Sequence, residues 1–432
     1  MRRALPLLLL AGCAVEPIAD DPAKQLSEVG RATYEAVLSS RQATSAIPAD
    51  QVLTIGNRSG PALLDGAAIF GELANLVRSA ETSVDIAMFV WEVDSDASRA
   101  LMSALENVGP QVKVRLLVND VALAGGGPST ARALESAITA RPINAQVSLA
   151  MRPHLAFGAM HEKLAIIDDR IAHLGGANVE AVHDWTDGAQ PWRDSAYVVD
   201  GEIAASLGVG FDALWESSDL ASCHGACVGV RERRAIVAGD VPMIALTRKP
   251  AGGPNNHTDS ALASGILAAF AAAEHSIAIQ TPNLNDDAVR ASLIEAIGRG
   301  VEVELVLSRD FNETTENAPG QGGGNRENVD RLYAEAMIGF GADHACRYLD
   351  ARWYAVSGGG VVDGNVAGAS HLKYTEVDEQ LVIVGSANMD TQSWNYSGES
   401  NIAIDDAETA RRYSRAIFAP TFALAEPSGH CR

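Results

Sequence analysis

Hydrophobic and polar residues follow the same order in two separate blocks of the chain. An apolar helix end leads into a short β-like run in "SAETSVDIAMFVWEVD" (79–94), and again in "AAEHSIAIQTPNLND" (272–286). A segment with apolar residues at three- and four-residue steps and then an alternating strand follow each run, at 96–120 and 287–310. Strand, helix and strand in this order are typical of βαβ units. We therefore expect an α/β fold with a mixed, mostly parallel sheet flanked by helices.

The repeat predicts two similar domains. The chain has 432 residues, which suits two domains of roughly 200 residues each. We place the boundary in "CHGACVGVRERRAIVAGD", so that residues 46–235 form the first domain and 236–432 the second. Residues 13–45 are polar and mixed, and we expect a tether or N-terminal helix there. The "RERR" arginines within the boundary segment are interpreted as a solvated face, with anionic lipid as an alternative contact.

The first residues, "MRRALPLLLLAGC", have the organisation of an export signal. Two arginines precede an apolar stretch that is too short to span a bilayer. The segment that ends at Cys13 resembles a bacterial lipobox, in which cleavage leaves the cysteine as the acylated first residue. We expect residues 1–12 to be removed and Cys13 to anchor the exported protein to the cell envelope, at the outer membrane if the cell is Gram-negative. An ordinary signal peptide with a chance cysteine is the alternative.

Composition narrows the class of partner. Hydrophobic residues make up 47% of the chain and charged residues 20%, which predicts a globular protein with a sizeable core. The formal net charge is −22. Nucleic-acid binders usually carry a basic face, so this balance argues against a nucleic-acid partner.

One short pattern occurs in both halves. "HEKLAIID" (161–168) and "HLKYTEVD" (371–378) each contain His, one spacer, Lys, four spacers and Asp. Residues at i and i+2 of a strand point to the same side, so imidazole and ammonium face one point. The return strands end in "GGAN" and "GSAN", which place an Asn 17 residues after each His. The hairpins therefore gather one set of polar groups in each half: His161, Lys163 and Asn178, then His371, Lys373 and Asn388.

These two copies resemble the HxKxxxxD signatures of the phospholipase D superfamily in its two-motif form. The resemblance covers most of residues 60–405, and "WRD" at 192–194 resembles the cardiolipin synthase branch. It implies two α/β repeats with one active site at their interface. It also implies phosphodiester cleavage through a phosphohistidine intermediate, without a metal or another cofactor.

The motif residues suit that chemistry. A phosphodiester is anionic and resists attack, so the lysines and asparagines would neutralise its transition state and bind the phosphate. One histidine attacks phosphorus and the other donates a proton to the leaving alcohol, which explains why the motif occurs twice. Following the family's usual assignment, we take His161 as the nucleophile and His371 as the acid. Asp168 and Asp378 complete the catalytic signature, but their place in turns indicates that they hold the hairpins.

Each histidine also needs a partner that fixes its tautomer and favours its charged form. The resemblance assigns this role to two carboxylates. Asp194 follows His161 by 33 residues, and Glu399 follows His371 by 28. Asp184 and Asp187 compete with Asp194 for its role.

Four further cysteines in an exported protein indicate disulfides. They are Cys223, Cys227, Cys346 and Cys431. "CHGAC" could close a small local loop and leave the other two to pair, although the sequence alone allows three pairings. A zinc site at Cys223, His224 and Cys227 is an alternative that lacks a second Cys/His pair at finger-like spacing.

Three functions remain open at this point. The first is a membrane-anchored, monomeric phospholipase D-like enzyme that cleaves or transfers phosphatidyl groups of glycerophospholipids, with the phospholipid membrane as its partner. The second is an exported nuclease of the same superfamily, which the negative charge and the lipid anchor disfavour. The third is a lipid-binding lipoprotein without activity, which the intact motifs disfavour. The long Gly-rich segment at 312–328 is expected at the mouth of the site.

Overall fold

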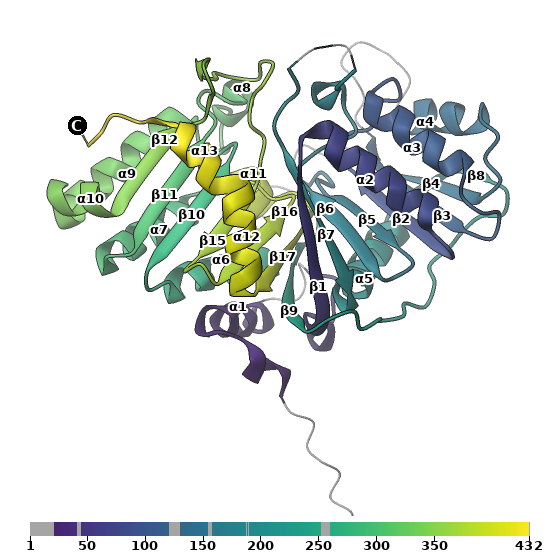
Figure 1. Ribbon diagram of the computed structural model, residues 1–432, viewed down its shortest axis with the longest axis horizontal. Helices are drawn as coiled ribbons and strands as arrows, with labels where there is room; N and C mark the ends of the chain where they lie inside the picture. The colour runs from purple at the N-terminus through teal and green to yellow at the C-terminus, as the bar shows by residue number, and fades with distance from the viewer. Residues whose placement is uncertain are drawn as a thin grey trace, which may run out of the picture.

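A single mixed sheet of sixteen strands runs through the whole molecule (Figure 1). The computed structural model describes residues 21–40, 45–120, 130–153, 158–186, 188, 190–251 and 260–431. From one edge, the strands of the second half are β18 (Glu426–Pro427), β12 (Leu349–Trp353), β11 (Glu302–Leu307), β10 (Ser276–Thr281), β15 (Tyr374–Val377), β16 (Leu381–Gly385), β17 (Glu399–Asp405) and β9 (Val241–Arg248). The first half continues with β1 (Leu53–Leu64), β7 (Ser195–Gly201), β6 (Ile171–Gly175), β5 (Lys163–Ile167), β2 (Ser83–Met88), β3 (Lys113–Asp120), β4 (Gln146–Pro153) and β8 (Asp219–His224).

The strand order reads the same from both ends towards the middle. β4-β3-β2-β5-β6-β7-β1 in the first half corresponds to β12-β11-β10-β15-β16-β17-β9 in the second. The predicted α/β fold with two repeats and a mixed sheet is therefore confirmed, but the expectation that the sheet is mostly parallel is wrong, because most of its strand pairs are antiparallel. Parallel pairing is confined to β2-β3-β4 and β10-β11-β12. The motif strands and their neighbours pair antiparallel, because tight hairpin turns connect them.

Helices cover both faces of this sheet (Figure 1). Those of the first half are α2 (Asp65–Ser79), α3 (Asp96–Glu106), α4 (Thr130–Thr139) and α5 (Glu202–Glu216). The second half contains α6 (Ala261–Ala272), α7 (Asp287–Arg299), α8 (Glu313–Glu316), α9 (Asn325–Phe340), α10 (Ala342–Tyr348), α11 (Thr391–Asn395), α12 (Ala407–Tyr413) and α13 (Ala419–Leu424). Short elements are the 3₁₀ turns at Pro22–Gln25, Ala49–Gln51 and Ala181–His183, the π turn at Ser414–Phe418, and a separate hairpin of β13 (Ala355–Val356) and β14 (Gly360–Val361). Among the described residues, no helix has both the length and the apolar character needed to cross a bilayer.

The two halves join along the pair β1–β9 at the centre of the sheet. This pairing is short, with Leu53 opposite Ile244 and Asn57 opposite Val241. Away from it, β6 approaches β16 and β17 although these strands are not neighbours in the sheet order. The fold therefore brings the motif hairpins of the two halves towards each other.

The segment expected to be a tether contains a helix that packs on the second half. In α1 (Glu28–Ser39), Val29, Thr33 and Val37 are buried, and the helix lies against α6. The backbone and hydroxyl of Ser27, which caps α1, both donate to the carboxylate of Asp405 at 2.7 Å. The described part of this segment is therefore attached to the folded body.

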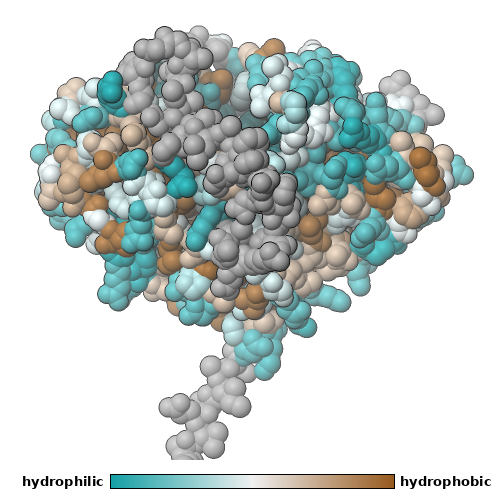
Figure 2. Space-filling view, turned by 180° about the vertical axis from the view of Figure 1, so that it is seen from behind, coloured by the Kyte–Doolittle hydropathy of each residue, from teal (hydrophilic) through white to brown (hydrophobic). Residues whose placement is uncertain are grey.

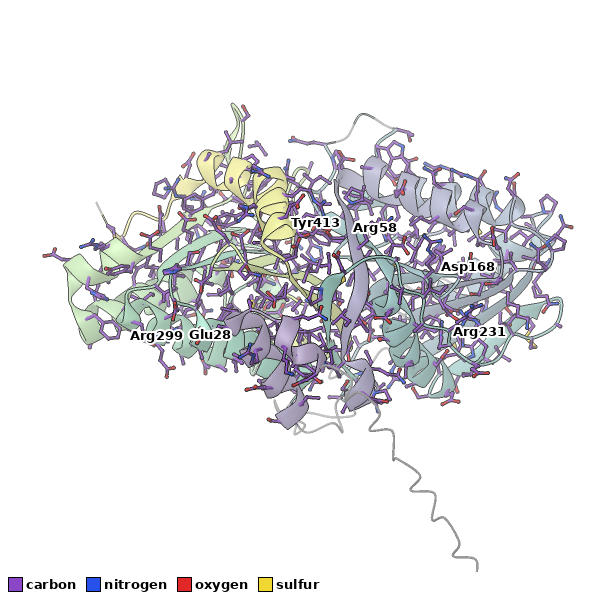
Figure 3. All side chains as sticks on the ribbon, turned by 60° about the horizontal axis from the view of Figure 1, so that its bottom comes forward. Glu28, Arg58, Asp168, Arg231, Arg299 and Tyr413 are labelled. Atoms are coloured by element: carbon purple, nitrogen blue, oxygen red, sulfur yellow. A yellow bond between two sulfur atoms is a disulfide. The ribbon has the colours of Figure 1, made fainter. Side chains whose placement is uncertain are left out.

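Two of the boundary arginines, Arg231 and Arg233, are part of a charge network, not a solvated face, whereas Arg234 is exposed as expected. Arg231 and Arg233 both bind the carboxylates of Asp85 and Asp169, and Arg233 also binds Asp212. Figure 3 shows Arg231 near Asp168 in the first half, away from Tyr413 and Arg58. The solvated interpretation was wrong because buried Asp85, which also binds the buried Arg115, needs nearby cations. On the face that points away from the viewer in Figure 1, hydrophobic residues lie scattered among hydrophilic ones (Figure 2).

Candidate active site

Each half binds the backbone of the other half's motif histidine. His161 N donates to the Gly398 carbonyl at 2.9 Å, and His371 N donates to the Arg193 carbonyl at 2.8 Å. Gly398 and Arg193 return the bond, to Ala159 and Ala369 respectively, each at 2.8 Å. These contacts form two short parallel bridges across the interface and place both histidines there.

The two predicted carboxylates pair with the histidines crosswise. Glu399 Oε1 lies 2.9 Å from His161 Nδ1, and Asp194 Oδ2 lies 2.8 Å from His371 Nδ1. Both carboxylates are fully buried, whereas the histidine side chains are 14% and 10% exposed. A carboxylate at Nδ1 holds the proton there, so Nε2 keeps the lone pair that a nucleophile or a base needs. Asp184 instead accepts from the backbone of Asp96, and Asp187 lies outside the described residues.

Both motif lysines are buried beside their histidines. Lys163 Nζ donates to the His161 carbonyl at 2.7 Å. Lys373 Nζ lies 2.9 Å from Nδ1 and 3.0 Å from Nε2 of His371. Burial lowers the pKa of Lys163 to about 7 and that of Lys373 to about 8, despite the nearby carboxylates. The two ammonium groups face the histidines, as the strand geometry predicts.

The charges of the site favour an anionic ligand. Burial lowers the pKa of His161, and burial together with the two lysines lowers the pKa of His371 well below its usual value. Burial pushes the pKa of Glu399 upward, but His161 and Lys163 bring it below its ordinary value. Burial raises the pKa of Asp194. A bound phosphate would favour the protonated forms of the lysines and histidines, because its negative charge offsets their positive charges.

Aromatic side chains form walls that sequence reasoning missed. Phe89 lies edge-on to His161 with ring centroids 5.0 Å apart, and Lys163 Nζ lies 5.0 Å from the centre of the same ring. Trp192 and Phe311 approach His371, with centroid distances of 5.8 Å and 5.6 Å. Phe311 directly precedes the Gly-rich segment 312–328 that was expected at the mouth. These residues lie far from the motif histidines in the sequence, and the strand and loop directions decide which side chains reach them.

A close backbone approach at Gly176 lets the halves meet. A Cβ at Gly176 would lie 2.2 Å from Asp194 Oδ1 and 2.8 Å from Lys373 Cδ, so only glycine fits there.

Two further buried groups support the carboxylates. Ser386 donates its hydroxyl to Glu399. Buried His183 lowers the pKa of Asp194 and so opposes the rise that burial causes. Sequence reasoning missed His183, whose isolated position in the chain offered no signal.

The motif asparagines are buried at the ends of the return strands. The amide of Asn388 donates to Asp390 at 2.8 Å, and that of Asn178 donates weakly to Glu180 at 3.4 Å. Each side-chain amide has two N–H donors, so one remains available to a ligand in each case. Their role in phosphate binding stays a prediction.

The motif aspartates lie away from the reacting centre. Asp168 follows β5, and Asp378 follows β15, at the ends opposite to the histidines. Asp168 accepts backbone bonds from Glu81, Thr82 and Ser83 at 2.7–2.9 Å. Asp378 accepts the equivalent bonds in the second half, at 2.8–2.9 Å. Both therefore fasten the motif hairpin to the start of the neighbouring strand, so they belong to the catalytic signature but not to the catalytic groups.

The cysteines form two disulfides, Cys223–Cys227 and Cys346–Cys431. The thiolates that the alternative zinc site would need are therefore used in a bond. Across the described ranges, no group of three or more His, Cys, Asp or Glu side chains is arranged to hold a metal ion. Cys13 lies outside the described residues.

A family model described as "Cardiolipin synthase, PLD-like domain" matches residues 73–184 and 266–419, more than half of the chain. The chain therefore belongs to this family of phospholipase D-like enzymes. The match includes both HxKxxxxD motifs and both return strands, but the orienting Asp194 lies outside it.

Curated relatives and a solved structure agree with this membership. The chain is 24% identical over 371 residues to a cardiolipin synthase of Oceanobacillus iheyensis, covering 84% of this chain and 68% of the relative. It is 23% identical to the major cardiolipin synthase of Bacillus subtilis, covering 81% and 66%. The chain thus spans about two thirds of the length of these relatives. A phosphatidylserine synthase of Haemophilus influenzae has a similar fold, with a TM-score of 0.63, 14% identity, and coverage of 93% and 92% of the two chains.

Proposed function

We propose that this protein is a metal-independent phosphatidyltransferase that moves the phosphatidyl group of a glycerophospholipid to an alcohol or to water. The crosswise pairing of His161 with Glu399 and of His371 with Asp194 carries the proposal. It supplies two imidazoles with fixed tautomers beside two lysines. A nucleophile, an acid and an anion site are what phosphodiester transfer requires. The relatives are named cardiolipin synthases, which supports a lipid substrate.

The first chemical step forms a phosphohistidine. His161 Nε2 attacks phosphorus, the bond from phosphorus to the leaving alcohol breaks, and His371 donates its proton to that alcohol. Lys163 and Lys373 stabilise the charge on the non-bridging oxygens, as do the free amide donors of Asn178 and Asn388. The positive charge that develops on His161 is stabilised by Glu399.

The second step reverses these roles. The oxygen of an incoming alcohol or water attacks phosphorus, and His371, now neutral, takes the proton from that oxygen. The P–N bond to His161 breaks, and the product phosphodiester or phosphatidic acid leaves. The nearly symmetric geometry supports either order of the histidines, and the choice of His161 as nucleophile follows the family resemblance.

Lipid and nucleic-acid substrates can be compared directly. Purified protein is incubated with phosphatidylglycerol and phosphatidylcholine micelles plus ethanol, with and without EDTA, and in parallel with plasmid DNA. We expect phosphatidylethanol or phosphatidic acid from the lipid micelles both with and without EDTA. The product should be lost in His161→Ala and His371→Ala. DNA nicking without any lipid product would favour the nuclease alternative. Quenching in neutral denaturant, which preserves the acid-labile P–N bond, and peptide mapping at the same pH then identify the phosphorylated histidine.

We also propose that the protein is exported and anchored by lipid on Cys13, which would place the site at a membrane. The lipobox-like "LAGC" (10–13) supports this proposal. Metabolic labelling with a fatty acid should label the wild type but not Cys13→Ala. Unlabelled wild type that is still secreted would favour an ordinary signal peptide.

A further inference from the structure

Residues 310–324 form a segment, called the mouth segment below, that lies over the catalytic acid. It follows β11 and contains α8, which Figure 1 shows at the top of the second half. The buried ring of Phe311 stacks on His371, with centroids 5.6 Å apart and an angle of 29° between the planes. The same ring lies 5.2 Å from that of Trp192. A side chain of the mouth segment therefore covers one face of His371.

Both ends of the mouth segment contain residues with left-handed backbone angles. The φ angles are 59° at Asp310 and 52° at Asn312, and they lie between 84° and 92° at Gly320, Gly322 and Gly323. Glycine accepts a change of φ and ψ more easily than other residues do. Such ends allow a segment to move as a unit, because a few positions absorb the change.

One buried side chain fastens the mouth segment to the body of the second half. The carboxyl oxygens of Glu316, the last residue of α8, accept from the amides of Asn283 at 2.9 Å and Asn285 at 2.6 Å. The Asn285 amide also donates to the Gly323 carbonyl at 3.0 Å, and its oxygen accepts from Thr391 N at 2.9 Å. Glu316 and Asn285 thus tie the segment to the connection between β10 and α7 and to the start of α11.

A second buried carboxylate acts on Glu316. Asp390 caps α11 through Ser393 N at 2.7 Å and accepts from the amide of Asn388 at 2.8 Å. Burial, and then the negative charge of Asp390, raise the pKa of Glu316 to about 8, although the bond from Asn285 opposes the rise. Glu316 therefore carries a proton at neutral pH. Its loss would place two negative charges together in a buried site, which is costly.

The other charged groups on the neighbouring elements do not offset a charge on Glu316. Asp286 caps α7 through two backbone N–H groups, and Glu313 on α8 and Glu327 on α9 are exposed. The charge of Asp390 opposes the fall that burial causes in the pKa of Lys373. Across the described residues, neither of the two buried carboxylates forms an ion pair.

We propose that the mouth segment is a lid over His371, that the neutral carboxyl of Glu316 latches it, and that ionisation of this carboxyl beside Asp390 releases it. Opening brings Glu316 into water, where its pKa returns to about 4.5 from about 8 in the closed lid. The latch is therefore fully effective below about pH 4.5 and is lost progressively as the pH rises to about 8. This inference goes beyond the proposed function, because it concerns access to the site.

The first test needs no substrate. Hydrogen exchange of peptides from the mouth segment is measured by mass spectrometry between pH 6 and pH 8 and divided by the intrinsic exchange rate at each pH. In the wild type the opening constant should rise by up to about tenfold per pH unit, because opening releases one proton. Glu316→Gln keeps the shape but cannot ionise, and its opening constant should change by less than about twofold. Glu313→Gln, on the exposed side of the same helix, should follow the wild type.

The second test asks whether the lid covers His371. Diethyl pyrocarbonate modifies neutral imidazole, and the pKa of both motif histidines lies below the ordinary value. His161, whose ring neighbour is Phe89, serves as the internal reference. Between pH 6.5 and pH 7.5 the rate at His371, divided by the rate at His161, should rise by up to about tenfold in the wild type and stay level in Glu316→Gln.

Other outcomes overturn the inference. Opening that is independent of pH in the wild type would show that Glu316 is not the latch, and a rise that persists in Glu316→Gln would assign it to another group. Constant reactivity of His371 while the segment opens would show that the segment does not cover it. If peptides from β10 and β11 show that Glu316→Gln is unfolded, the two wild-type series still decide. Absence of any lipid product would contradict the proposed function and leave both tests intact.

Discussion

At the scale of single residues, the catalytic histidines depend on carboxylates that lie far away in the chain. His161 and Glu399 are 238 positions apart, and His371 and Asp194 are 177 apart. Resemblance to the family identified both carboxylates, but not which histidine each one serves. The structure pairs each carboxylate with the histidine of the other half, because the two bridges at Gly398 and Arg193 exchange backbone between the halves.

This exchange predicts which histidine responds to each carboxylate. Glu399→Gln should lower the pKa of His161 further and leave that of His371 nearly unchanged, because His161 is the one of the two histidines that contacts the lost negative charge. Asp194→Asn should do the reverse. Nitrogen chemical shifts of the two imidazoles, followed through a pH titration, measure this, and each variant should lose roughly 10- to 100-fold in kcat. A response of the histidine in the same half would contradict the crosswise pairing.

The lysines predict weaker anion binding as pH rises. In the free protein the pKa is about 7 for Lys163 and about 8 for Lys373, so both ammonium groups lose their protons between pH 7 and 9. Binding an anion above that range requires uptake of protons, which costs affinity. Diethyl phosphate, whose charge is constant here, should therefore bind more weakly at pH 9 than at pH 6.5. Calorimetry measures both the affinity and the protons taken up, and a pH-independent affinity would show that the lysines stay charged.

At the scale of elements, the motif hairpins are built in the same way twice. The two residues that follow each motif strand have positive φ angles: 54° and 58° at Asp168 and Asp169, and 56° and 51° at Asp378 and Glu379. Asp and Asn tolerate this conformation better than most residues do. The periodicity of the sequence predicted these hairpins and the flanking βαβ units. It did not reveal that the aspartates bind the next strand, because that contact joins residues about 85 to 105 positions apart.

Removing a motif aspartate should reduce stability more than chemistry. Asp168→Ala loses three backbone bonds and one to the Thr82 hydroxyl. We expect the free energy of unfolding to fall by about 2–4 kcal/mol, with kcat of the folded protein within a few-fold of wild type. Asp240→Ala, at an exposed loop position, is the control and should change stability by less than about 0.5 kcal/mol. Urea unfolding measures the free energy of unfolding of both variants, and a transfer assay measures kcat. A stable but inactive Asp168→Ala would show that Asp168 is a catalytic group.

At the scale of the whole molecule, two covalent links close loops of very different length. Cys346–Cys431 joins positions 85 apart and ties the C-terminus to α10, whereas Cys223–Cys227 joins positions 4 apart at the end of β8. The longer link removes more conformational freedom from the unfolded chain. Chain entropy predicts about 4–5 kcal/mol for the long loop and about 2 kcal/mol for the short one.

The paired variants Cys346→Ser/Cys431→Ser and Cys223→Ser/Cys227→Ser test this difference. We expect the first to lower the midpoint of chemical unfolding clearly more than the second, under oxidising conditions. Reducing agent should bring the wild type below both variants. Equal losses in the two double variants would mean that local packing, not loop length, determines what each disulfide contributes.

The sequence by itself determined the parts of this protein that depend on short spacing. His and Lys two apart on a strand, the turn after the motif and the Asn at the end of the return strand all follow from the period of two in a β-strand and from turn chemistry. Repetition of the pattern then indicated two halves and one site. Only the tertiary structure decided which carboxylate serves which histidine, which aromatic rings enclose them, and that Arg231 and Arg233 are bound by buried carboxylates. Those features depend on how two halves of one sheet fold over the β1–β9 pair, and local sequence carries no record of such long-range contacts.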